Sequence, residues 1–226
     1  VNLAYTGTAT DGTDFTGVAS VVVTGGTSSA TFTIATIDDA LADNAETIII
    51  DIDSIVDTNS SFEAMVEGTN NQVTTTITDD LTPGPEDQVE VSLVGPATVI
   101  EGETTANYTI SLEQAVPAGN SVTVNLAYTG TATDGSDFTG VASVVVTGPS
   151  NTATFTIATL DDALADNAET IIVDIDSIVD TNNSFEAMIE GTNNQVTTTI
   201  SDQTGSDATP GPEDQVEVSL VGPATV

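Results

Sequence analysis

Hydrophobic residues alternate with polar ones over short stretches of this chain. Every second position is apolar at Val89, Val91 and Leu93, and the same spacing recurs further along at Ile110 and Leu112. A period of two is typical of β-strands that bury one face, and the segments between these stretches are rich in Gly, Pro, Asp and Asn. The pattern predicts seven strands, at about 89–93, 106–112, 122–128, 141–147, 153–159, 169–176 and 195–200.

Seven short strands separated by turns predict an all-β fold. The number of strands and their spacing favour an immunoglobulin-like antiparallel β-sandwich, in which two sheets pack face to face. We letter the predicted strands A to G in chain order.

The same pattern occurs more than once. Residues 1–80 align on residues 124–203 without a gap, and only 11 of the 80 positions differ. The eighteen residues at 82–99 return at 209–226. We therefore expect tandem repeats cut from a longer array: a partial repeat (strands C to G) at 1–80, a linker at 81–87, a complete repeat at 88–203, a linker at 204–214, and the first strand of the next repeat at 215–226.

The charge of the chain is entirely one-sided. It has 35 Asp and Glu residues but no Lys, Arg, His or Cys, which gives a formal net charge of -35. Disulfides, imidazole bases, thiolate nucleophiles and phosphate-binding lysines are therefore excluded. Nucleic acid is not an expected partner because its phosphates would be repelled, and no apolar run is long enough for membrane insertion. Paired carboxylates alone do not indicate an enzyme, and we expect none.

The predicted strand order gathers many carboxylates at one end of the complete repeat. In an up-and-down arrangement, loops AB, CD and EF and the exit from strand G share one end of the sandwich. Nine acids fall there: Glu101, Glu103, Asp134, Asp137, Asp161, Asp162, Asp166, Glu169 and Asp202. With no cationic side chain available, such acids stay solvated, become protonated or bind a cation from solution. Converging oxygen ligands on flexible loops favour Ca²⁺, and general surface acidity, as in salt-adapted proteins, is the alternative.

Four segments of the complete repeat resemble a Calx-beta domain. They are "VIEGETTANYTISL", "VTVNLAYTGTATDGSDFTG", "ATFTIATLDDALADNAETIIVDI" and "TTTISD", in this order. The resemblance covers the complete repeat and, from strand C onward, the partial one. It implies an immunoglobulin-like sandwich with Ca²⁺ bound at one end.

The resemblance also implies a set of calcium ligands. In the complete repeat they are Glu101, Asp137, Asp161, Asp162, Asp166 and Asp202, with Glu169 as a further candidate. In the partial repeat they are Asp14, Asp38, Asp39, Asp43, Asp79 and Asp80, with Glu46 as a further candidate. The partial repeat has no counterpart of Glu101 in this sequence, and Gln203 stands where the partial repeat has Asp80.

Near-identical adjacent copies favour a spacer over a specialised sensor. The resemblance to repeats of large bacterial surface adhesins, such as the extender region of RTX adhesins, leads us to expect a calcium-rigidified extender or filament segment in adhesion or biofilm matrix. It would be extracellular or on the cell surface, in contact with neighbouring repeats and able to self-associate laterally or end to end. Two alternatives are a regulatory calcium sensor and a ligand-binding or bundling module whose FG loop exposes Phe185, Met188 and Ile189.

Overall fold

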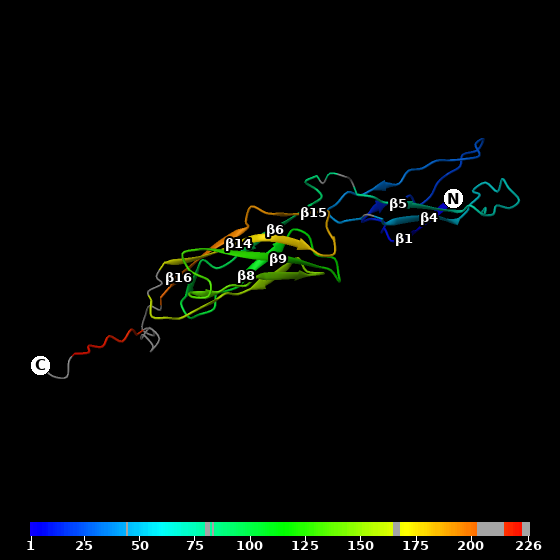
Figure 1. Cartoon of the computed structure of the whole chain (residues 1–226). Helices are drawn as coiled ribbons and strands as arrows, with labels where there is room; N and C mark the ends of the chain where they lie inside the picture. The colour runs from blue at the N-terminus through cyan, green and yellow to red at the C-terminus, as the bar shows by residue number, and fades with distance from the viewer. Residues whose placement is uncertain (44, 80–81, 83, 165–167, 203–214, 223–226) are drawn as a thin grey trace. The chain divides into compact units, whose positions relative to one another are not determined.

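The computed structural model describes residues 1–43, 45–79, 82, 84–164, 168–202 and 215–222. All regular structure in these residues is β-strand, which confirms the predicted all-β class (Figure 1). The described residues contain no helix of the length and hydropathy needed to cross a membrane. The chain forms two compact units, the first made of residues 1–88 with 185–187, and the second of residues 89–184 with 188–226.

A five-stranded sheet forms one layer of the second unit. The strands lie in the order β11-β9-β14-β16-β7. Neighbours are antiparallel except for β7, which runs parallel to β16. The strands are β7 (Thr98–Ile100), β9 (Ser121–Gly130), β11 (Ser143–Thr147), β14 (Glu169–Asp180) and β16 (Gln195–Ser201).

A four-stranded sheet forms the other layer, in the order β12-β8-β6-β15. It consists of β6 (Gln88–Val94), β8 (Tyr108–Leu112), β12 (Thr152–Phe155) and β15 (Ala187–Glu190). Two short strands, β10 (Phe138–Thr139) and β13 (Ala158–Thr159), pair with each other beside these sheets. The two layers form the predicted β-sandwich, and all seven predicted strands are present.

The alternating residues of both sheets form the core of the second unit. Val91, Ile110 and Val124 are fully buried, as is Tyr108. The ring of Tyr108 stacks on Phe155 at a centroid distance of 4.9 Å. Burial of these side chains removes apolar surface from water, which is the main favourable term in folding. The period-two pattern therefore identified the buried faces correctly.

The segment that follows β14 bears on the alternative of an exposed FG loop. That alternative requires Phe185 to be exposed, but only 5% of its surface is accessible. Met188 is half-buried, and Ile189 is 36% exposed. Phe185 forms an isolated β-bridge with Leu41, and residues 187–190 form β15, which extends the four-stranded sheet next to β6. This segment is thus folded onto the edge of the sandwich instead of projecting as a free loop.

The first unit contains a three-stranded sheet and a two-stranded sheet. The three-stranded sheet has the order β1-β4-β5 and consists of β1 (Asn2–Gly7), β4 (Thr47–Ser54) and β5 (Gln72–Thr76). The two-stranded sheet pairs β2 (Phe15–Thr16) with β3 (Ala35–Thr36). Phe15 and Ile48 are buried at the centre of its core. This sequence holds no counterpart of β6 and β8 before β1, so Val23 is 45% exposed whereas its equivalent Val146 is fully buried.

The predicted boundaries between repeats stay predictions. The linker at 204–214, and residues 81 and 83 of the first linker, lie outside the described residues. Residues 215–222, expected to open a further strand, have no assigned strand structure, and their side chains are exposed.

Candidate metal centre

In the second unit, backbone contacts join the loops that carry the predicted acids. The amide of Asp162 donates to Glu101 Oε1 at 3.0 Å, which ties the loop after β13 to the loop after β7. The amide of Leu160 donates to the carbonyl of Asp137 at 2.9 Å, and the amide of Glu101 to the carbonyl of Ser201 at 3.0 Å. The three loops and the end of β16 therefore meet at one end of the sandwich, as the strand order predicted.

Local hydrogen bonds position several of these carboxylates. Asp137 Oδ2 accepts from the amide of Thr133 at 2.6 Å, and Asp162 Oδ1 accepts from the amide of Leu164 at 2.6 Å. Glu101 is only 3% exposed. Gly102 has a φ of +73°, and a Cβ at this position would lie 3.1 Å from Asp161 Cβ, so glycine gives both the backbone conformation and the space.

The described acids of the second unit lie on loops that meet at one end of the sandwich, but they do not form a group of three close carboxylates. Among its described residues, no three acids have ligand oxygens within 4.8 Å of one another. Asp166 lies outside the described residues. Asp161, Glu169 and Asp202 are half-buried. The predicted site of this unit is thus described only in part.

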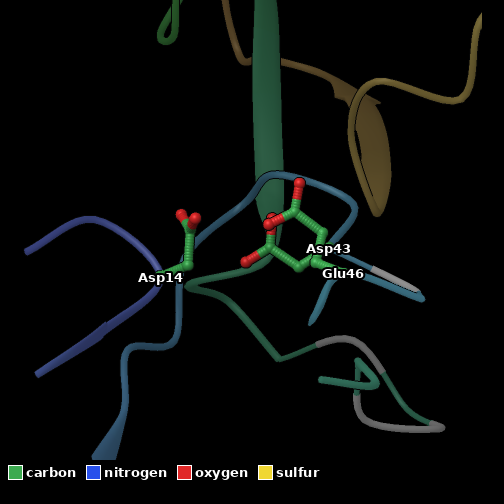
Figure 2. Close-up of side chains that lie close together, drawn as sticks. All are labelled: Asp14, Asp43 and Glu46. Carbon is green, nitrogen blue, oxygen red and sulfur yellow. The ribbon is translucent and has the colours of Figure 1, made fainter. Parts of the chain in front are cut away.

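In the first unit, three predicted ligands come together. Oxygens of Asp14, Asp43 and Glu46 all lie within 4.8 Å of one another, and Figure 2 shows the three carboxylates grouped between the turn before β2 and the loop before β4. Asp14 is 7% exposed, and its Oδ2 accepts from the amide of Thr10 at 2.6 Å. The amide of Asp43 donates to Asp79 Oδ1 at 3.0 Å, which fixes the loop against the end of β5.

The electrostatics of this group are unfavourable in the absence of a cation. Burial, followed by the charges of Asp14, Asp39, Glu46 and Asp79, raises the pKa of Asp43 from 3.8 to about 6. Burial and the nearby Asp14 also raise the pKa of Glu46. Glu46 Oε2 is buried without a hydrogen-bond donor. The sequence has no Lys, Arg or His, so only a proton or a dissolved cation can compensate these charges.

The other predicted ligands of the first unit lie around this group. Asp39 Oδ1 accepts from the amide of Leu41 at 2.7 Å. Asp80 lies outside the described residues. Asp38 belongs to a different group, with Glu86 and Asp87. Glu86 and Asp87 were not among the predicted ligands. The signal that could have found them is "PGPED", which occurs in both linkers.

Comparison with known proteins identifies the family. The model of the Calx-beta domain family matches residues 3–81 and 85–204. The chain therefore belongs to the Calx-beta domain family, and the two matched regions correspond to its two repeats. The comparison with curated protein sequences found no match.

Solved structures similar to this chain include two from Calx. The apo form of the Calx CBD1 domain is 18% identical, with a TM-score of 0.42, and the match covers 51% of this chain and 98% of that one. The calcium binding domain CBD12 of CALX1.1 is 16% identical, with a TM-score of 0.41, and the match covers 88% of both chains.

The raised pKa of Asp43 predicts a pH effect on the cation-free protein. Because the folded-state pKa of about 6 exceeds the ordinary value of 3.8, the protein takes up a proton on folding between these values. Stability should therefore rise as the pH falls from 7 towards 4.5. After allowance for solvent screening, protonation of Asp43 over this range should add about 1 kcal/mol to the free energy of unfolding.

Thermal unfolding in EDTA between pH 7.5 and 4.5 measures this effect. All acids contribute to the slope, so the matched control is the variant Asp43→Asn, which should show a weaker dependence. Identical slopes for the two proteins would show that the charge of Asp43 is fully solvated.

Proposed function

We propose that this chain is a structural segment of a large secreted or cell-surface protein, stiffened by Ca²⁺ bound at the acidic end of each Calx-beta repeat. The observation that carries the proposal is the group Asp14, Asp43 and Glu46, three partly or fully buried carboxylates in a chain with no cationic side chain. The proposed role is non-catalytic.

The chemistry of the group suits calcium. Its ligands are carboxylate oxygens on loops, which fit the six to eight oxygens and flexible geometry of Ca²⁺ better than the strict octahedron of Mg²⁺. CBD12 of CALX1.1, to which this chain is similar, is a calcium binding domain. By the alignment of the repeats, Asp137, Asp166 and Glu169 are the corresponding residues of the second repeat, with Glu101, Asp161, Asp162 and Asp202 as further ligands.

The position of the acids connects ion binding to stiffness. Asp79 lies three residues after the end of β5 and shortly before the linker at 81–87, and its carboxylate accepts a hydrogen bond from the amide of Asp43. A cation at Asp14, Asp43 and Glu46 would remove the repulsion among these loops and fix the end of the strand from which the linker starts. Near-identical repeats whose linkers are fixed by Ca²⁺ would form a spacer for adhesion or a matrix filament.

Binding measurements test the proposal. Isothermal titration of the chain should show Ca²⁺ binding with dissociation constants of roughly 0.1–1 mM, the range of extracellular modules. Excess Mg²⁺ should leave most of this binding in place, because the loops do not impose an octahedral geometry. Equal and weak heats for both ions would indicate general charge screening and would contradict the proposal.

A further inference from the structure

A second group of acids lies in the first unit, outside the group described above. Oxygens of Asp38, Glu86 and Asp87 lie within 4.8 Å of one another. Asp38 follows β3, whereas Glu86 and Asp87 belong to the linker and precede β6. Residues about fifty positions apart in the sequence are therefore brought together between a loop of the sandwich and the linker.

Asp87 is the feature that distinguishes this group from ordinary surface acidity. Its side chain is only 2% exposed. Its Oδ2 accepts a hydrogen bond from the amide of Gly84. Its Oδ1 is buried and has no hydrogen-bond partner. An ionised carboxylate oxygen buried without a donor is strongly unfavourable unless a charge compensates it.

The linker sequence places both acids. Gly84 supplies the amide that holds Asp87. A Cβ on Gly84 would lie 2.5 Å from Glu86 Oε1, so the absence of a side chain at 84 leaves room for the Glu86 carboxylate. Glu86 itself is exposed and remains accessible to an ion from solution. Gly84 therefore holds the Asp87 carboxylate with its amide and leaves space for the Glu86 carboxylate because it has no side chain.

From these contacts we propose a second divalent-cation site, formed by Asp38, Glu86 and Asp87, that fastens the linker to the first unit. Its ligands are all oxygens, and the buried Oδ1 of Asp87 supplies the charge that needs compensation. Ca²⁺ fits this donor set best. This site goes beyond the proposed function because none of its ligands belongs to the Asp14, Asp43 and Glu46 group.

Paramagnetic relaxation in the whole 226-residue chain tests the site directly. Mn²⁺, added in small amounts in place of Ca²⁺, should broaden the amide signals of Gly84 and Asp87, and excess Ca²⁺ should restore them. Separate broadening at Thr10 and Asp43 reports the other site. Loss of signal at Thr10 without any effect at Gly84 would overturn the linker site while leaving the proposed function intact. The reverse pattern would support the linker site and reject the proposed function.

The variant Asp87→Asn gives an independent test by ion counting. Asparagine keeps the shape of the side chain and an oxygen that can accept from Gly84, so the cation-free protein should be at least as stable as the wild type. The number of bound Ca²⁺ ions should fall by one. The exposed variant Glu86→Gln should weaken the same site several-fold, whereas Glu63→Gln, elsewhere in the first unit, serves as the matched control. An unchanged ion count in Asp87→Asn would overturn the proposal.

Discussion

Replacing Asp43 by Asn and Glu46 by Gln together is expected to remove the calcium-dependent stability of the first unit. In several millimolar Ca²⁺ a site with a dissociation constant of 0.1–1 mM adds about 1 to 3 kcal/mol to the free energy of unfolding. The double variant loses this contribution because two of the three clustered carboxylates are gone. Relative to a total domain stability of about 5–15 kcal/mol, the loss is large.

The same double variant should be more stable than the wild type when cations are absent. The wild type then holds Asp43 and Glu46 next to Asp14 with raised pKa values, and neutral amides relieve that repulsion. In urea unfolding, the double variant should therefore be more stable than the wild type in EDTA and less stable than the wild type in Ca²⁺. The control Asp53→Asn changes an exposed acid of β4 and should behave like the wild type in both conditions. A double variant that is less stable in both conditions would show that these carboxylates act in packing and not in ion binding.

Replacing Gly130 by Ala is expected to destabilise the second unit by about 3 kcal/mol or more. Gly130 ends β9 with a φ of +115°, a conformation that L-residues with a side chain rarely adopt. A Cβ here would lie 2.1 Å from the carbonyl oxygen of Thr170 in β14. That oxygen also accepts hydrogen bonds from the amides of Thr131 and Ala132, both at 3.1 Å, so it has no freedom to move.

Gly119→Ala is the matched control for this prediction. Gly119 also has a positive φ, of +90°, but a Cβ there would meet no atom within 4 Å. Its replacement should cost only the backbone strain, about 1 kcal/mol. Denaturant unfolding of the two variants separates strain from steric clash. If Gly130→Ala costs no more than Gly119→Ala, the end of β9 must be able to move away from β14.

The strands of the sandwich were predictable because burial imposes a period of two on long strands. Val89, Val91 and Leu93 alternate along β6 and are all buried. The shorter strands β7, β10 and β13 have two or three residues each, too few to show a period. The strand β15 was missed because "AMIE" does not alternate, and its place next to β6 depends on tertiary pairing.

The candidate site was predictable at the level of loops but not of individual side chains. Strand direction alone brings the acidic loops to one end, and the hydrogen bond between Asp162 and Glu101 shows this convergence. The adjacent acids Asp38 and Asp39 were treated as one unit, whereas the structure places Asp38 with Glu86 and Asp87. The separation of Asp38 from Asp39 depends on the linker folding back towards the loop after β3. The period of the hydrophobic residues carries no information about that fold.

The most direct test of the central claim is small-angle X-ray scattering of this chain in millimolar Ca²⁺, in the same concentration of Mg²⁺, and in EDTA. If the acidic ends and the linker bind Ca²⁺ specifically, Ca²⁺ alone should produce a longer and stiffer particle, and EDTA should return it to a flexible ensemble. If Ca²⁺ and Mg²⁺ change the scattering equally, or if neither changes it, the carboxylates are solvated surface charge and the chain is not a calcium-stiffened spacer.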